Sequence, residues 1–209
     1  MSAGSYQLYL EDAAGCVRTY DFAILPSPDL VVDLGENQSL ILGETLDLRA
    51  LASSENVTYT WEGIDPTTDC TNDNCSEISL LPTQSGTYTV MVTDTVTFCT
   101  AQASVFVEVN KVHKLFFPTA FSPNDDGVND KFIMFGQRGV ESVTNFRVFD
   151  RYGGLIHEAF DFMPEDLSAG WDGIYRGKLV DSGVYVWYAQ VLFIDGETEV
   201  FSGDVTVMR

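Results

Sequence analysis

The feature that most constrains the fold is the repeated alternation of apolar and polar residues in short runs. These runs are rich in Val, Thr, Tyr and Phe, and clusters of Gly, Asp, Asn and Ser separate them. A period of two is typical of strands that bury one face, and no segment keeps the 3.6-residue period of an amphipathic helix. The runs are Tyr6–Leu10, Thr45–Leu51, Val57–Trp61, Tyr88–Thr93, Ser104–Val109, Phe146–Phe149, Val184–Ile194 and Glu199–Val207. This spacing predicts an all-β protein of tandem antiparallel, immunoglobulin-like β-sandwiches.

Composition is compatible with packed cores and narrows the choice of partners. Of the 209 residues, 45% are hydrophobic and 12% are aromatic, which suits one or two globular domains. The net charge of −20 makes nucleic acid an unsuitable partner, because an acidic surface repels phosphate. No apolar run approaches the ~18 residues that a transmembrane helix requires. Residues Met1–Gly4 do not begin a signal peptide, so we expect a C-terminal fragment or a chain whose export signal was removed.

An internal repeat indicates where the domains lie. Tyr6–Cys16 matches Tyr88–Cys99 in its strand, its acidic turn and its terminal cysteine, with an offset of 82 residues and one insertion. We therefore expect residues 1–27 to be the truncated end of an upstream β repeat. Residues 28–110 would form a complete sandwich, and residues 111–209 a C-terminal β-sandwich domain.

Residues 28–110 follow an expected linker, Leu25–Pro28. Trp61, two residues after Tyr59, suits a buried aromatic side chain on a central strand. The segment Ser85–Val90 resembles the corner before the penultimate strand of PKD-like and immunoglobulin-like adhesin repeats. That resemblance implies a stalk of extracellular modules.

The four cysteines fall into two kinds of surroundings. Cys70 and Cys75 flank a short polar loop, where we expect a disulfide, because the loop lacks the second cysteine pair of a typical zinc site. Disulfide use indicates an oxidising, extracytoplasmic compartment. Cys16 and Cys99 occupy equivalent repeat positions; we expect Cys16 to be unpaired and Cys99 to be a buried thiol.

Three separately placed motifs mark the C-terminal part of the chain. They are Pro118–Phe132, Trp171–Trp187 and Ser202–Arg209. In this order they resemble the gliding motility-associated C-terminal domain, a sorting domain (type B) carried by cargo of the type IX secretion system of Bacteroidetes. The resemblance implies export through the periplasm and across the outer membrane to the cell surface or beyond. Its implied partners are the type IX translocon and accessory outer-membrane proteins.

The same resemblance points to candidate recognition residues. They are Asp150, Arg151, Gly153, Trp171, Asp172 and Arg209. A glycine turn with an Asp–Arg pair also has a purely structural interpretation. Exposed cations that would contribute electrostatically are Lys131, Arg138, Arg147, Arg151, Arg176, Lys178 and Arg209.

The last hairpin, Val184–Val207, has an expected turn at Asp195–Gly196, a dipeptide suited to a type I′ turn. Alternate residues of its first strand form one aromatic and aliphatic face, which we interpret as core and, alternatively, as a sugar-binding platform. These residues are Tyr185, Trp187, Ala189, Val191 and Phe193.

The loop Ser122–Asp130 is rich in oxygen ligands. Its spacing reproduces the later part of a calcium-binding loop, but the first and twelfth positions carry Ser and Ile in place of Asp and Glu. The alternative is a turn whose side chains bond their own backbone, with Gly127 at positive φ. The candidate calcium ligands are Asn124, Asp126, the Val128 carbonyl and Asp130.

Catalytic signatures are lacking in the sequence. There is no GxSxG, HExxH or phosphate-binding glycine loop, and Glu165–Asp166 has no distinguishable second carboxylate. Pairing of Cys99 with His113 or His157 is supported by no local motif. We therefore expect no enzyme. The alternative function is an extracellular module that binds carbohydrate or protein with calcium ordering a loop, and a third is the accessory domain of a hydrolase.

Overall fold

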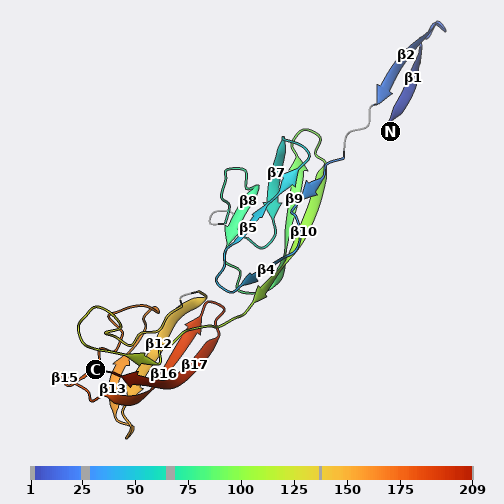
Figure 1. Cartoon of the computed structure of the whole chain (residues 1–209). Coiled ribbons are helices and arrows are strands. Elements are labelled where there is room, and N and C mark those ends of the chain that lie inside the picture. Colours follow the sequence, from blue (N-terminus) through green and yellow to red (C-terminus); the bar gives the residue numbers. More distant parts are fainter. Residues whose placement is uncertain (1–2, 25–28, 65–68, 137, 209) are drawn as a thin grey trace.

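The computed structural model describes residues 3–24, 29–64, 69–136 and 138–208. Every regular element in these ranges is a β-strand, so the prediction of an all-β protein of β-sandwiches is confirmed. A hairpin, a middle module (residues 29–110) and a C-terminal module (residues 111–208) follow one another along the chain (Figure 1). The expected linker Leu25–Pro28 lies outside the described residues. The described residues contain no helix long and apolar enough to cross a membrane.

The N-terminal hairpin repeats the local geometry of the middle module. Its strands β1 (Gly4–Glu11) and β2 (Val17–Ile24) pair antiparallel with each other. Asp12 and its repeat equivalent Asp94 donate their backbone N–H to the carbonyl of the repeat cysteine, at 3.1 and 2.9 Å. The Oδ1 atom of each aspartate also accepts two backbone N–H groups of its turn. The sequence repeat is therefore also a repeat of structure.

The middle module is built from eight strands around one core. The strands are β3 (Val32–Asp33), β4 (Gln38–Ile41), β5 (Leu46–Arg49), β6 (Leu51–Ala52), β7 (Val57–Trp61), β8 (Glu77–Leu80), β9 (Gly86–Asp94) and β10 (Thr100–Asn110). The main sheet has the order β4-β10-β9-β7, and β5-β8 and β3-β6 form separate pairs. Alternate residues of the facing strands fill the core, as the period of two predicted. They include Leu46, Leu48, Ile78, Val90, Val92, Val105 and Val107.

Trp61 is buried, as expected, with 8% of its surface exposed. Its strand β7, however, lies at an edge of the main sheet, so the expectation of a central strand was wrong. The reason is that β8, the next strand along the chain, pairs with β5 instead of continuing the sheet beyond β7. The Trp61 indole N–H donates to the carbonyl of Cys75 at 2.8 Å.

Cys70 and Cys75 form the expected disulfide, and Cys16 is unpaired. Cys99 is also a free thiol, but it is exposed, so the expectation of a buried side chain was wrong. Cys99 lies in the turn between β9 and β10, directly after Phe98, whose φ is 58°. Strand alternation therefore does not direct its side chain into the core.

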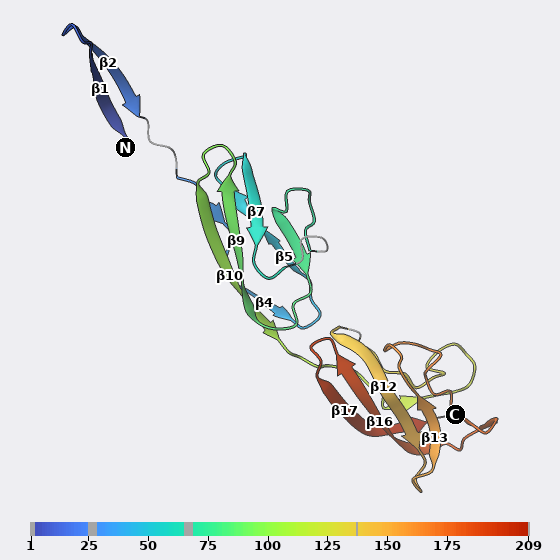
Figure 2. The same cartoon turned by 180° about the vertical axis from the view of Figure 1, so that it is seen from behind.

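The C-terminal module has one large sheet covered on one face by loops. Its strands are β11 (Ala120–Phe121), β12 (Val140–Phe149), β13 (Leu155–Ala159), β14 (Ile174–Tyr175), β15 (Lys178–Leu179), β16 (Gly183–Phe193) and β17 (Thr198–Val207). The sheet order is β11-β17-β16-β12-β13, with β14-β15 as a separate pair (Figure 2). Much of the covering layer is held by isolated bridges, such as Phe132 with Trp171.

The predicted apolar face of β16 is core. Tyr185 and Trp187 are 9% and 5% exposed, and Ala189, Val191 and Phe193 have no exposed surface. Phe117 stacks on Trp187 with ring centroids 4.0 Å apart. The sugar-platform interpretation of this face is therefore wrong.

The turn between β16 and β17 differs from the predicted type I′ turn. Gly196 has a φ of 82°, but Asp195 does not have positive φ, which a type I′ turn requires at both central residues. Four residues, Ile194–Glu197, connect the two strands, and the Phe193 N–H donates to the carbonyl of Glu197 at 2.9 Å. This geometry places the Asp195 side chain against the linker from the middle module.

Candidate functional site

The loop Ser122–Asp130 is organised by the side chain of Asp130. Its Oδ1 atom accepts the backbone N–H groups of Asn124 and Asp125, at 3.0 and 2.7 Å, and its Oδ2 atom accepts that of Gly127 at 2.7 Å. Desolvation alone would raise the pKa of Asp130, but these backbone hydrogen bonds outweigh it and lower the pKa. The ionised carboxylate is therefore the cap of the loop.

The other candidate calcium ligands also make hydrogen bonds inside the loop. The Asn124 side-chain amide donates to Oδ2 of Asp126 at 2.9 Å, and Oδ1 of Asp126 accepts the N–H of Val128 at 2.8 Å. Gly127 has a φ of 84°, as the turn interpretation predicted. A cation would have to compete with these bonds for the same oxygen atoms.

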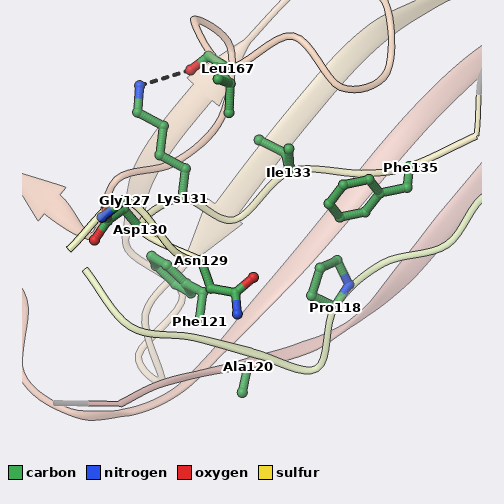
Figure 3. Close-up of a pocket in the computed structure, with 10 residues that line it drawn as sticks. All are labelled: Pro118, Ala120, Phe121, Gly127, Asn129, Asp130, Lys131, Ile133, Phe135 and Leu167. Atoms are coloured by element: carbon green, nitrogen blue, oxygen red, sulfur yellow. Dashed lines mark hydrogen bonds between the residues drawn. The ribbon is translucent and has the colours of Figure 1, made fainter. Parts of the chain in front are cut away.

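An apolar pocket of about 350 Å³ lies beside this loop (Figure 3). Its lining residues are Pro118, Ala120, Phe121, Gly127, Asn129, Asp130, Lys131, Ile133, Phe135 and Leu167. The Lys131 ammonium donates to the carbonyl of Leu167 at 2.8 Å on one side of the pocket. The pocket thus combines an apolar lining with one cation and the capped loop.

The turn between β12 and β13 carries three of the candidate recognition residues, Asp150, Arg151 and Gly153. The Asp150 carboxylate accepts the backbone N–H groups of Tyr152 and Gly154, each at 2.8 Å. Gly153 has a φ of 82°, which favours glycine. Arg151 is exposed and Tyr152 is 90% exposed. Asp150 and Gly153 therefore shape the turn, and Arg151 and Tyr152 form its accessible tip.

The structure separates the other recognition candidates. Trp171 has no exposed surface, so it belongs to the core of the folded module and its side chain does not form part of the outer surface. Asp172 accepts the N–H of Ile174 at 2.9 Å and holds a second turn. Arg209 lies outside the described residues.

The candidate cations are partly engaged within the chain. Arg147 pairs with Glu158 at 3.6 Å, and Arg138 pairs with Glu44 of the middle module at 2.6 Å. Arg151 makes no ion pair with the residues that the structure describes. Its side chain is exposed at the tip of the β12–β13 turn.

A charge cluster that the sequence did not reveal joins the linker after β10 to the β16–β17 turn. Lys111 Nζ lies 3.1 Å from Asp195 Oδ2 and 3.1 Å from Glu197 Oε1. The His113 ring, with a side chain 5% exposed, contacts Asp195 and Glu199. His113, Asp195 and Glu197 are close enough to hold a metal ion, but the Lys111 ammonium already bridges the two carboxylates. The only sequence signal was the Asp195 turn, and it did not identify the partner residues.

Comparison with known proteins identifies one family within the chain. The family model described as CHU_C type IX secretion signal domain matches residues 115–207. No curated protein sequence matches the chain significantly.

Several solved structures are similar at low identity. SGBP-B of the Bacteroides ovatus mixed-linkage glucan utilization locus has 17% identity and a TM-score of 0.34, over 88% of this chain and 48% of that chain. A SusE-like surface-located polysaccharide-binding protein of Bacteroides thetaiotaomicron has 10% identity and a TM-score of 0.33, over 98% and 43%. Latent PorU of Porphyromonas gingivalis has 12% identity and a TM-score of 0.30, over 99% and 24%. The chain thus spans less than half the length of these proteins.

The match covers the capped loop, the β12–β13 turn and the closing hairpin, so residues 115–207 are similar to the CHU_C type IX secretion signal domain, which indicates export of the chain to the cell surface or the extracellular space.

Proposed function

We propose that the type IX translocon and its accessory outer-membrane proteins recognise the C-terminal module as a folded domain. The observation that carries this proposal is the position of β17. It pairs with β16 over ten residue pairs and with β11 on its other side, so the last strand completes the sheet. The motifs of the signal come together only when this sheet is formed. A linear terminal peptide would not present them.

Within the folded module, we assign recognition to the tip of the β12–β13 turn. Arg151 offers an exposed guanidinium that makes no ion pair within the described ranges, and Tyr152 offers an exposed ring beside it. Asp150 and Gly153 position this tip through the turn geometry described above. Arg176 provides a matched control, because it is an exposed arginine whose guanidinium lies 5.1 Å from the ring centroid of Tyr175.

The matched family is a non-catalytic sorting domain. We extend this to the whole chain and assign it no catalytic activity, which the lack of a catalytic motif in the sequence supports. A carbohydrate-binding module that uses a tryptophan platform would need exposed indole rings. All three tryptophans, Trp61, Trp171 and Trp187, are buried, so carbohydrate binding through a tryptophan platform is not favoured.

Calcium is proposed as a weak ligand of the capped loop. Asn124, Asp126, the Val128 carbonyl and Asp130 supply hard oxygen ligands, although hydrogen bonds within the loop use most of the side-chain atoms. The ion would stabilise the loop and would not take part in chemistry.

The recognition proposal is tested by fusing the whole chain behind a periplasm-directed fluorescent reporter in a type IX-competent host. Arg151→Ala should lower the exported fraction, whereas Arg176→Ala should not. Thermal melts of the purified variants verify that both remain folded. Equal export of the two variants would remove Arg151 from the recognition surface.

A further inference from the structure

One end of the C-terminal module is completed by a residue far outside the matched segment. Leu42, in the turn between β4 and β5, is 1% exposed and belongs to the same buried cluster as Val140 and Phe193. Its backbone N–H donates to the carbonyl of Asn110 at 3.0 Å. β4 lies at the end of the middle module that faces the C-terminal module (Figure 1). A leucine from one module is therefore part of the core of the next.

The two modules meet at a pair of glycines. A Cβ atom on Gly43 would lie 2.3 Å from the backbone N of Gly139, and one on Gly139 would lie 3.1 Å from the Leu42 carbonyl oxygen. Both glycines also have positive φ, of 86° and 71°. The Gly139 carbonyl in turn accepts the N–H of Ile194 at 3.0 Å. Backbones approach this closely only where glycine leaves room.

A charged pair lies beside the glycine contact. Arg138 Nη1 lies 2.6 Å from Glu44 Oε1, and Glu44 Oε2 accepts the N–H of Ile41 at 2.8 Å. The Glu44 carboxylate thus closes its own turn and faces the other module. This fixes the turn that carries Leu42.

The linker between the modules makes a second, independent set of contacts. Lys111 bridges Asp195 and Glu197, and the His113 ring stacks on Phe193 with centroids 4.0 Å apart. The Asp195 side chain has no exposed surface. The linker is therefore bound to the β16–β17 hairpin at the same end of the module as Leu42.

Domains joined by a linker are expected to move relative to each other unless their interface is extensive and apolar. Here the middle module and the linker contact the same end of the C-terminal module. The contacts are a fully buried leucine, a glycine pair and a charge cluster. We propose that the middle and C-terminal modules form one rigid unit, docked through Leu42, and that this unit is the folded signal delivered to the translocon. The statement about delivery rests on the proposed function; the docking does not.

Hydrogen exchange on the whole chain tests the docking with a matched glycine pair. Gly43 and Gly35 both lie in the middle module with positive φ, but a Cβ on Gly35 would meet nothing within 4 Å. Gly43→Ala should accelerate exchange in peptides covering 140–143 and 193–197 of the other module, by about tenfold or more if the packing of Leu42 is lost. Gly35→Ala should leave those peptides unchanged. Unchanged exchange in the Gly43→Ala chain would overturn the docking.

A distance measurement by pulsed electron paramagnetic resonance tests rigidity directly. Nitroxides are attached to Cys99, a free exposed thiol, and to a Tyr152→Cys site that is 90% exposed, in a Cys16→Ser background. We expect a single narrow distance distribution that Leu42→Ser broadens. Leu81→Ser, at a leucine 57% exposed in the middle module, is the control and should leave it narrow. A broad distribution in the chain without the Leu42 substitution would overturn the proposal.

Export of the whole-chain reporter separates this inference from the sorting assignment. Gly43→Ala should reduce export, and Gly35→Ala should not. Equal export of both would overturn delivery of the rigid unit and leave sorting by the C-terminal module intact. Failure of the unsubstituted fusion to be exported would contradict the sorting assignment. The hydrogen-exchange and spin-label distance measurements would still decide whether the two modules are docked.

Discussion

The Nδ1 atom of His113 lies 2.6 Å from the Oε1 atom of Glu199. Its Nε2 atom lies 3.2 Å from Asp195 Oδ2, and only a protonated ring donates to both carboxylates. Burial alone would lower the pKa of His113, but the hydrogen bonds to Glu199 and Asp195 outweigh it and raise the pKa. A raised folded-state pKa stabilises the chain below the unfolded value of about 6.5, and this contribution is lost as the pH rises through the folded-state pKa.

His113→Gln should therefore destabilise the chain most at mildly acidic pH, by about 2 kcal/mol near pH 6. Urea unfolding of both proteins at pH 6 and pH 9 measures the difference in the free energy of unfolding. Burial lowers the pKa of His157, so its contribution to the free energy of unfolding has the opposite dependence on pH. His157 is present in both proteins, so this contribution cancels in the difference between them. A difference that grows with pH would contradict the assigned contacts.

Calcium should stabilise the chain only slightly. The extracellular range of dissociation constants is ~0.1–1 mM. At ten times the dissociation constant, the folded chain would gain about 1.4 kcal/mol. Thermal melts with calcium and with chelator should differ modestly, and Asp130→Asn should lower the midpoint in both because the loop loses its charged cap. If saturating calcium does not change the midpoint of thermal unfolding, the loop does not bind calcium and the turn interpretation is the one that remains.

The disulfide predicts the number of reactive thiols. The unreduced, denatured protein should give two, from Cys16 and Cys99, and the reduced protein should give four. Mass spectrometry after alkylation makes the count. Replacing both Cys70 and Cys75 by Ser should lower the free energy of unfolding by less than about 3 kcal/mol, because the bridged loop is short. Four thiols in the unreduced protein would refute the bridge.

The strands and the two cores followed from the sequence because alternation with a period of two reports burial directly. The buried face of β16 was predicted correctly for this reason. The Cys70–Cys75 disulfide was predicted correctly from the position of both cysteines in one short loop. The pairing of strands was harder to predict. The sequence of β8 does not indicate that this strand pairs with β5 and leaves β7 at an edge of the main sheet. The burial of a side chain in a turn was also hard to predict, because strand alternation does not continue through turns; Cys99 is exposed for this reason.

The candidate site was only partly readable from the sequence, for a related reason. The capped loop and the β12–β13 turn are local, so their residues lie close together in the chain. The contacts of Leu42 with the C-terminal core and of His113 with Glu199 join positions far apart. No periodicity or motif encodes such contacts, so they required the structure.

Export of the whole-chain fusion is the measurement that tests the central claim most directly. The reporter should appear outside the cell or on its surface in a host with a working type IX translocon. It should stay in the periplasm when the translocon is absent. Deleting residues 202–209 removes much of β17 and exposes the unpaired edge of β16, so that fusion should also be retained. Export of the truncated fusion, or equal export without the translocon, would contradict sorting by a folded C-terminal domain.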